Sequence, residues 1–519
     1  MRIEDHLRET AVNMPDKTAL VVGGIRMSYR DLDAQSDRVA SALAARGVAR
    51  GDRVLLVADN SAEAVVALYA VVKAGAIACP LNPQTRADKF SAICARIEPA
   101  AMIMQARLGG MAERVCSEDM PRIAIANDGA ELRSGWIDFG TLAAGASLSE
   151  SVDVGRPGGA GGAGELALLI HTSGSTGVPK GVMLTHDNVT AACTAIVTYL
   201  ENTAEDIILS VLPLSFGYGL TQVVTAAMCG ATLVLEKSFA FPRVILKRMA
   251  EEGVTGFPLV PTMAALLLQM KDLSPGFLPK LRYITSAAAQ LPPVMSMGLR
   301  SLFPDAQLCI MYGQTECLRA TWLPPQDVAL KPTSAGIAIP GGEVAVVDER
   351  GVPVAPGVIG ELVVRGPHVM QGYWRDEAAT AAALRPAPEP WGRELRTGDL
   401  FRMDEDGYFY FVTRNDDIII TRGEKVSPQE VERVLYAFEG IREAAVVGTA
   451  DPILGEAVKA VIVAEPGRRL DEREIIRHCA RFLEDFMVPK AIEFRDSLPR
   501  TASGKIRLEE QHQATEATA

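Results

Sequence analysis

The stretch ELALLIHTSGSTGVPKG, residues 165–181, joins a short apolar run to a loop rich in glycine and hydroxyl residues. The run at 165–170 predicts a buried strand. The loop at 171–181 holds three Gly, four Ser or Thr, Lys180 and no acidic residue. Gly is costly to order, so such a loop is typical of a tight turn or of close backbone approach to a ligand. Amide and hydroxyl donors beside a lysine predict a site for phosphate oxygens.

The alternative for this loop is a solvent-exposed linker. The preceding stretch GRPGGAGGAG at 155–164 has that character, because it holds neither a hydroxyl residue nor a lysine. The loop at 171–181 differs in both respects, which favours phosphate binding. It is not the P-loop of ordinary NTPases, because Lys180 precedes Gly181 where G-x-x-x-x-G-K-[ST] requires the reverse order.

Helix and strand patterns alternate on either side of this loop. Apolar residues recur at helical spacing over 34–49, GDRVLLVADN at 51–60 predicts a strand, and EAVVALYAVVKAG at 63–75 predicts a second helix. The alternation continues past residue 300. We therefore expect an α/β fold, with a large multi-layer N-terminal domain and largely parallel sheets.

The pattern changes near residue 341. GGEVAVVDERGVPV at 341–354 predicts a hairpin, and GELVVRG at 360–366 and GYFYFVTR at 407–414 predict short strands. This part of the chain is therefore expected to form a β-rich subdomain.

A small mobile α+β domain is expected at the C-terminal end, so that the chain divides into 1–415 and 416–519. Its first helix has Ser427 as the expected N-cap, Pro428 at the first helical position and Glu430 completing a capping box. Two strand patterns and a second helix pattern follow.

Charge, cysteine content and the first residues bear on the partners and on the compartment of the protein. The chain has 519 residues and a net charge of −12, without a block of Lys and Arg, so we expect no nucleic-acid partner. Its eight cysteines form no C-x-x-C pair and indicate core thiols in a reducing compartment. The charged start MRIEDHLRET lacks the apolar core of a signal peptide, which favours a cytoplasmic protein.

Residues 207–235 contain no charged side chain and are long enough to span a bilayer. Pro213 and the polar residues among them argue against a membrane helix. We expect a buried strand, a loop and a buried helix here, with no transmembrane segment. Peripheral membrane contact stays open.

Four further stretches are unusually polar or glycine-rich for their surroundings. They are MYGQTE (311–316), RTGDL (396–400), RNDDIIITRGEKVSP (414–428) and LPRTASGKIRL (498–508). Together with the loop at 171–181, their order and spacing resemble the AMP-forming adenylate ligases, over essentially the whole chain. That superfamily includes acyl-CoA synthetases, adenylation domains of peptide synthetases, and luciferases.

The resemblance implies a ligase that uses ATP and Mg²⁺. Such an enzyme joins a carboxylic acid to AMP with release of pyrophosphate, and then passes the acyl group to the thiol of CoA. Because an anionic carboxylate must approach an anionic phosphate, the site has to supply cations and hydrogen-bond donors.

The resemblance also assigns the nucleotide site. The phosphate-binding residues it implies are Thr172, Ser173, Gly174, Ser175, Thr176, Gly177 and Lys180. The adenine and ribose would contact Ala287, Ala288, Ala289, Tyr312, Gly313, Asp399 and Arg414. The family usually has Gly-Ala-Ala at the first three of these positions, so Ala287 is expected to narrow the adenine slot slightly. Taken alone, Asp399 would be a turn residue and Arg414 a surface charge.

The catalytic residues implied by the resemblance are Lys505, Thr315 and Glu316. Lys505 would bridge the attacking carboxylate and the α-phosphate, and Glu316 would hold Mg²⁺ with Thr176 nearby. Asp416 would be the hinge of the C-terminal domain, and Gly423 would line the tunnel for the pantetheine arm. Outside the motifs, Lys505 and Glu316 would be read as ordinary surface charges.

The acyl pocket is expected to be apolar. Its predicted lining is Phe216, Gly217, Val260, Pro261, Gln314 and Cys317. Gly217 stands where amino-acid-activating relatives carry an aspartate, which disfavours α-amino acids because a buried ammonium would lack a partner. Gly217 and Gly219 are expected to leave room, so a fatty or aryl acid is the predicted substrate.

Three alternatives stay open at this point. The acyl group could pass to the phosphopantetheine of a carrier protein in place of CoA. An oxygenase of the luciferase type would use the same adenylation residues. A non-catalytic binding protein would be expected to lose Lys505, Glu316 or Asp399, and all three are present. Either a monomer or a homodimer is compatible with the sequence.

Overall fold

The computed structural model describes residues 1–113, 115, 120–126, 129–145, 162–172, 179–414, 419–421, 424–451 and 455–500. The chain forms two compact units. The first comprises Met1–Val344 and Val363–Arg396, and the second comprises Ala345–Leu362 and Thr397–Ala519. The predicted boundary between residues 415 and 416 stays a prediction.

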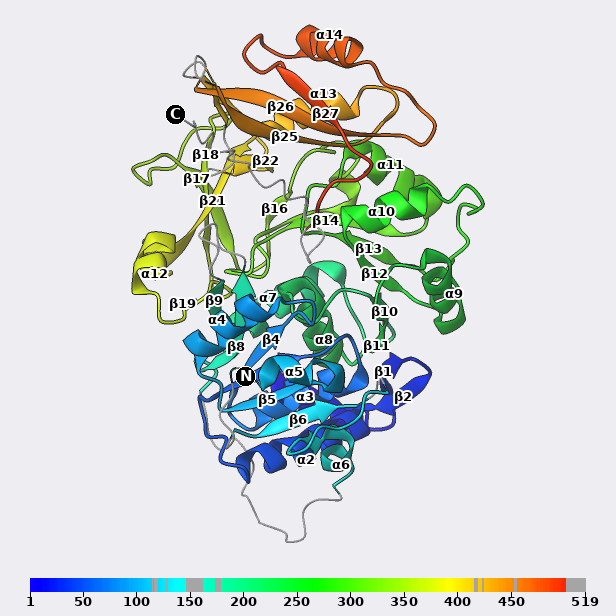
Figure 1. Cartoon of the computed structure of the whole chain (residues 1–519), viewed down its shortest axis with the longest axis vertical. Coiled ribbons are helices and arrows are strands. Elements are labelled where there is room, and N and C mark those ends of the chain that lie inside the picture. The colour runs from blue at the N-terminus through cyan, green and yellow to red at the C-terminus, as the bar shows by residue number, and fades with distance from the viewer. Residues whose placement is uncertain are drawn as a thin grey trace, which may run out of the picture. The chain divides into compact units, whose positions relative to one another are not determined.

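A nine-stranded sheet of the first unit has the order β16-β15-β14-β13-β12-β10-β11-β1-β2 (Figure 1). Its strands are β1 Thr18–Val22, β2 Ile25–Ser28, β10 Ile207–Ser210, β11 Thr232–Leu235, β12 Gly256–Leu259, β13 Tyr283–Ser286, β14 Gln307–Tyr312, β15 Thr321–Leu323 and β16 Ile337–Ala338. From β1 to β14 through β11, β10, β12 and β13 all pairings are parallel, whereas β2, β15 and β16 join in antiparallel pairings.

An eight-stranded sheet of the same unit has the order β19-β9-β8-β4-β3-β5-β6-β7. Its strands are β3 Arg53–Val57, β4 Ile77–Leu81, β5 Ala101–Gln105, β6 Arg122–Ile125, β7 Ile137–Asp138, β8 Leu166–Thr172, β9 Lys180–Thr185 and β19 Gly372–Tyr373. Only the pairings of β8 with β9 and of β9 with β19 are antiparallel.

Helices accompany both sheets. They are α1 Ile3–Asn13, α2 Tyr29–Ala44, α3 Ala62–Lys73, α4 Ala87–Ile97, α5 Gly109–Ala112, α6 Phe139–Ala144, α7 His186–Leu200, α8 Gly217–Cys229, α9 Pro242–Glu252, α10 Pro261–Leu268, α11 Pro293–Leu302 and α12 Glu377–Ala383, with short 3₁₀ turns at Ala106–Leu108 and Pro325–Asp327. Most residues of α3 and α8 are buried, as expected of helices that are apolar on nearly all sides.

The remaining strands form two five-stranded sheets. One has the order β17-β18-β21-β20, with β22 against β21, from β17 Glu343–Val347, β18 Gly360–Arg365, β20 Leu384–Pro386, β21 Arg393–Met403 and β22 Phe409–Arg414. The other has the order β24-β23-β26-β25, with β27 against β26, from β23 Ile419–Thr421, β24 Glu424–Val426, β25 Ile441–Asp451, β26 Gly455–Ala464 and β27 Ala491–Phe494. Helices α13 Pro428–Tyr436 and α14 Glu472–Phe482 complete the second unit. The predicted α/β class, β-rich subdomain and small α+β domain are confirmed.

The local predictions had mixed outcomes. Residues 207–235 form β10, α8 and β11, and no helix among the described residues is long and apolar enough to cross a membrane. Ser427 is the N-cap of α13 with Pro428 at its first position, but the predicted capping box is wrong. The Ser427 hydroxyl instead donates to the carbonyl of Val412 at 2.6 Å, because β22 offers that acceptor beside the helix start.

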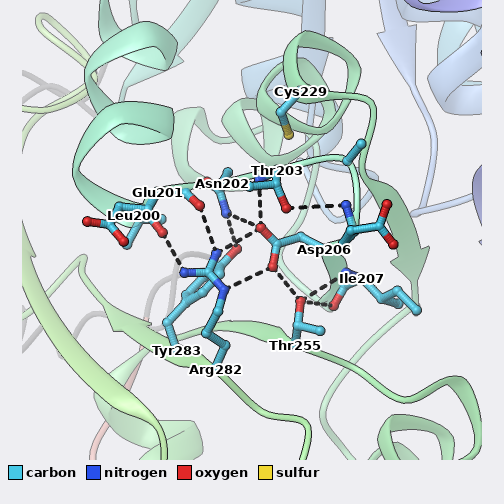
Figure 2. Close-up of polar contacts among 12 residues, drawn as sticks. Leu200, Glu201, Asn202, Thr203, Asp206, Ile207, Cys229, Thr255, Arg282 and Tyr283 are labelled. Carbon is cyan, nitrogen blue, oxygen red and sulfur yellow. Dashed lines mark hydrogen bonds and ion pairs between the residues drawn. The ribbon is translucent and has the colours of Figure 1, made fainter.

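Asp206, just before β10, is the centre of a buried polar network (Figure 2). Its carboxylate accepts from Arg282 at 2.8 Å, from Thr255 at 2.7 Å and from the backbone N–H of Thr203 at 2.9 Å. Arg282 also donates to the carbonyl of Leu200 at the end of α7. The network thereby ties one helix end to the starts of three neighbouring strands.

Replacing Asp206 with alanine is expected to lower the free energy of unfolding by about 2 kcal/mol, because Arg282 and three further donors lose their acceptor while Arg282 keeps some solvent contact. All four tryptophans lie in the first unit, so urea unfolding followed by tryptophan fluorescence reports on it. The control Asp272→Ala removes only the exposed pair with Arg243 and should leave the unfolding curve unchanged.

The effect of Asp206 is expected to depend on pH. Burial raises the pKa of its carboxyl, but the hydrogen bonds from Arg282, Thr203, Thr255 and Asn202 outweigh burial and lower the pKa overall. A carboxyl whose pKa is lower in the folded than in the unfolded protein stabilises the folded state at any pH above its unfolded-state pKa of about 3.9. This stabilisation is lost as the pH falls through the folded-state pKa. The difference between wild type and Asp206→Ala should therefore shrink in acid, and a constant difference would contradict this account.

Candidate functional site

The candidate residues of the nine-stranded sheet share one position in the fold. They follow the carboxyl ends of four adjacent parallel strands: Phe216 and Gly217 after β10, Val260 and Pro261 after β12, Ala287–Ala289 after β13, and Tyr312–Cys317 at the end of β14. Figure 1 shows these strands side by side. Ligands of open α/β sheets bind outside the carboxyl ends of the strands, so the topology brings the predicted adenine and acyl residues to one edge.

The loop that follows β14 is tightly folded. Tyr312 pairs with Thr321 across β14 and β15, so the intervening residues form a hairpin loop. A Cβ at Gly313 would lie 2.7 Å from the carbonyl oxygen of Leu318, which means that only glycine fits there. Leu318 has a left-handed backbone with φ of 57°, a conformation that costs energy in a non-glycine residue. Thr315 and Glu316, between these positions, are half-buried and remain accessible.

Ala288 is also held in a left-handed conformation, with φ of 75°. It is exposed together with Ala289, whereas Ala287 is buried in a hydrophobic cluster with Met311 and Cys309. The methyl group of Ala287 therefore packs into the core of the unit, where it does little to narrow an exposed slot. Strained backbone at both Ala288 and Leu318 is typical of functional loops.

The two glycines of α8 are explained by close packing. A Cβ at Gly219 would lie 2.3 Å from the carbonyl oxygen of Pro213, and one at Gly217 would lie 2.8 Å from Cδ2 of Leu318. The expectation that Gly219 leaves room for substrate is wrong, because backbone occupies that space. Beside Gly217 the space is taken by a flexible leucine side chain.

Tyr373 contacts both Glu316 and Lys180, and none of the sequence motifs includes it. The hydroxyl of Tyr373, in β19, donates to Oε1 of Glu316 at 2.9 Å, and Nζ of Lys180 lies 5.2 Å from the centre of the Tyr373 ring. Tyr373 pairs with Val182 across β19 and β9. The arrangement therefore joins a carboxylate, a phenol and a cation from the two large sheets. Its only sequence signal is the aromatic pair in QGYW at 371–374.

The carboxylate of Glu316 fits a magnesium ion shared with phosphate. Mg²⁺ is usually held by one or two carboxylates and by oxygens of its substrate. Within the part of the chain that the structure describes, no three His, Cys, Asp or Glu side chains gather as metal ligands.

Asp399 and Arg414 of the second unit form a pair. They face each other across β21 and β22, with Nε of Arg414 3.3 Å from Oδ1 of Asp399. Asp399 is buried and its N–H donates to the hydroxyl of Thr397 at 3.1 Å. The structure thus brings these two predicted ribose ligands together as an ion pair.

Several predicted residues lie outside the described part of the chain. In the phosphate loop, Thr172 pairs with Lys180 across β8 and β9, which closes the loop at its base. The undescribed residues are Ser173, Gly174, Ser175, Thr176, Gly177, Asp416, Gly423 and Lys505. Their roles stay predictions.

Comparison with known proteins gives full-length similarities. The AMP-binding enzyme family matches residues 7–374, and the AMP-binding enzyme C-terminal domain matches 430–505. Feruloyl-CoA synthase of Amycolatopsis is 34% identical over 95% of this chain and 94% of its own. Long-chain-fatty-acid–CoA ligase of Bacillus subtilis is 31% identical over 97% and 93%. The solved structure of o-succinylbenzoate CoA synthetase from Bacillus subtilis, in complex with ATP and magnesium, has a TM-score of 0.84 at 27% identity and covers 96% and 98%.

Tyr373→Phe is expected to raise the Mg²⁺ concentration for half-maximal pyrophosphate release about three- to tenfold, because the Glu316 carboxylate loses the donor that orients it. The measurement is a Mg²⁺ titration at saturating ATP. Tyr410→Phe is the matched control. Its hydroxyl also donates to a carboxylate, that of Asp404, but both residues belong to the second unit and Glu316 belongs to the first. An unchanged Mg²⁺ dependence in Tyr373→Phe would contradict the positioning role.

Proposed function

This chain belongs to the AMP-binding enzyme family, and from that premise we propose that it activates a carboxylic acid with ATP and passes the acyl group to the thiol of CoA. The activity is that of an AMP-forming acid–CoA ligase. The observation that carries it is the gathering of the candidate adenine and acyl residues at the carboxyl ends of β10, β12, β13 and β14.

Two charged residues of the first unit, Lys180 and Glu316, suit the formation of the acyl-adenylate. Lys180 supplies a cation at the base of the phosphate loop, and Glu316 is held by Tyr373 where it can take part of the coordination of Mg²⁺. When bound, Mg²⁺ neutralises phosphate charge and so lowers the repulsion that the carboxylate meets. Thr315, beside Glu316, is proposed to donate to the α-phosphate.

The nucleoside is proposed to bind through flat and hydrogen-bonding groups. Tyr312 is half-buried at the end of β14 and is suited to stack on adenine, with Ala288 and Ala289 exposed after β13. The Asp399 carboxylate, which forms an ion pair with Arg414, is suited to accept from both ribose hydroxyls.

We assign the C-terminal domain, 416–519, to a lid that turns about Asp416. In one position it would bring Lys505 to the carboxylate, and in the other it would bring Gly423 to the pantetheine tunnel. These assignments rest on the resemblance of the motifs.

The proposed substrate is a fatty or aryl acid, bound in a pocket that includes Phe216, Val260 and Pro261, which are half-buried and apolar. We place the reaction in the cytoplasm, where CoA and ATP are present, and the seven described cysteines are free thiols as a reducing compartment requires. The enzyme is proposed to act as a monomer or a homodimer.

The test is pyrophosphate release with ATP and Mg²⁺ against a panel of fatty, aryl and amino acids, with and without CoA. Release that accelerates with CoA and yields an acyl-CoA is the expected result. Release that stalls near one turnover despite CoA would identify a carrier-protein thiol as the acceptor. Release with none of the acids would refute the proposed activity.

Lys505→Ala is expected to slow adenylate formation by at least about a hundredfold, because the transition-state charge loses its cation. Transfer from a supplied acyl-adenylate to CoA should stay within about threefold of wild type, since Lys505 acts in the first half-reaction only. Lys490→Ala, an exposed lysine of the same unit, is the control. An equal fall in both half-reactions would exclude the role given to Lys505.

A further inference from the structure

Arg319 is a buried cation without a counter-charge. It follows Leu318 on the returning side of the hairpin loop and is 2% exposed. Its Nε has no hydrogen-bond partner, and the guanidinium forms no ion pair with a carboxylate among the described residues. A charged side chain this deeply buried is normally paired.

Four groups that interact with Arg319 are neutral. The guanidinium lies over the ring of Tyr218, 5.2 Å from its centre, and it interacts with the hydroxyl of Tyr199 and with the thiols of Cys193 and Cys309. Burial raises the pKa of both phenols well above the ordinary value and raises the pKa of each thiol to about 12. None of these groups therefore carries a negative charge at neutral pH.

A purely structural role explains Arg319 poorly. One aromatic face offsets only part of the free energy needed to remove a guanidinium from water. Stacking also uses only the face of the guanidinium. The N–H groups on its edge lie in the plane of the group, where they are able to bind a carboxylate through two parallel hydrogen bonds.

Arg319 is placed beside the acyl pocket. Tyr218 is the second residue of α8 and follows Gly217, and Leu318, the neighbour of Arg319, packs against Gly217. Lys180 and Glu316, by contrast, meet through Tyr373. Arg319 is thus connected, through Leu318 and Tyr218, to a predicted residue of the acyl pocket, whereas Lys180 and Glu316 are connected to each other.

We propose that Arg319 determines substrate specificity by binding a second carboxylate, at the end of the acid away from the reacting carboxyl group. This inference rests on the proposed ligase function and narrows its substrate class to dicarboxylic acids with an apolar body. The apolar residues of the pocket would contact that body, and the buried guanidinium would pair with the distal carboxylate.

The test compares acids that differ only in the second carboxylate. Adipate is paired with hexanoate and terephthalate with benzoate, and kcat/KM is measured by pyrophosphate release. Wild type is expected to prefer the diacid of at least one pair by about tenfold or more. Arg319→Met should abolish that preference while keeping the monoacid within about threefold, and Arg319→Lys should keep part of it. The control Arg300→Met, at an exposed arginine on α11, should leave kcat/KM unchanged for both acids of each pair.

Two outcomes would overturn the inference. If wild type releases pyrophosphate with the monoacids and shows no preference for either diacid, the ligase function stands and the role of Arg319 is refuted, even if Arg319→Met fails to fold. The second outcome is an equal fall in kcat/KM for both acids of a preferred pair in Arg319→Met, with an unchanged melting temperature. Arg319 would then act on the reacting carboxylate, and the second-carboxylate role would be excluded. Absence of release with every acid would refute the ligase function, and this inference with it.

Discussion

The parallel pairing of β10, β12, β13 and β14 is the constraint on which the site depends. Parallel strands return through crossover connections, so their carboxyl ends all face one edge and each releases its loop there. Residues from Phe216 to Cys317, separated by about one hundred positions, thereby come to one place. The buried network around Asp206 supports the opposite ends of the same strands, because it joins the start of β10 to the residues just before β12 and β13.

Two of the five non-glycine residues that have a left-handed backbone in the described part of the chain lie in the loops at this edge. Ala288 and Leu318 adopt left-handed conformations without being glycine, and Gly313 and Gly219 are in contact with backbone atoms that leave no space for a side chain. Each of these features restricts the loops to one shape. A loop of one shape holds Thr315 and Glu316 in place before a ligand arrives, which lowers the cost of ordering them during binding.

The charged residues that we assign to the site in the first unit fall into two sets with different partners. Lys180 and Glu316 meet through Tyr373, at the junction between the eight-stranded and nine-stranded sheets. Arg319 lies among neutral aromatic and thiol groups that come from α7, α8 and β14. An enzyme that joins an acid to a nucleotide must bind two anionic substrates close together, and separate cations for each are a direct way to do so.

The sequence by itself determined the class of fold and most of the motif residues. Alternating helix and strand patterns predicted the α/β layers, and the five polar stretches predicted Glu316, Tyr312, Asp399 and Arg414, because local composition and order survive in the linear chain. The tertiary structure alone decided which residues complete these motifs. Tyr373 lies 57 positions from Glu316, and Arg319 lacks a counter-charge because neutral groups from α7, α8 and β14 lie around it. Contacts and desolvation arise between distant segments, so neither is encoded in local spacing.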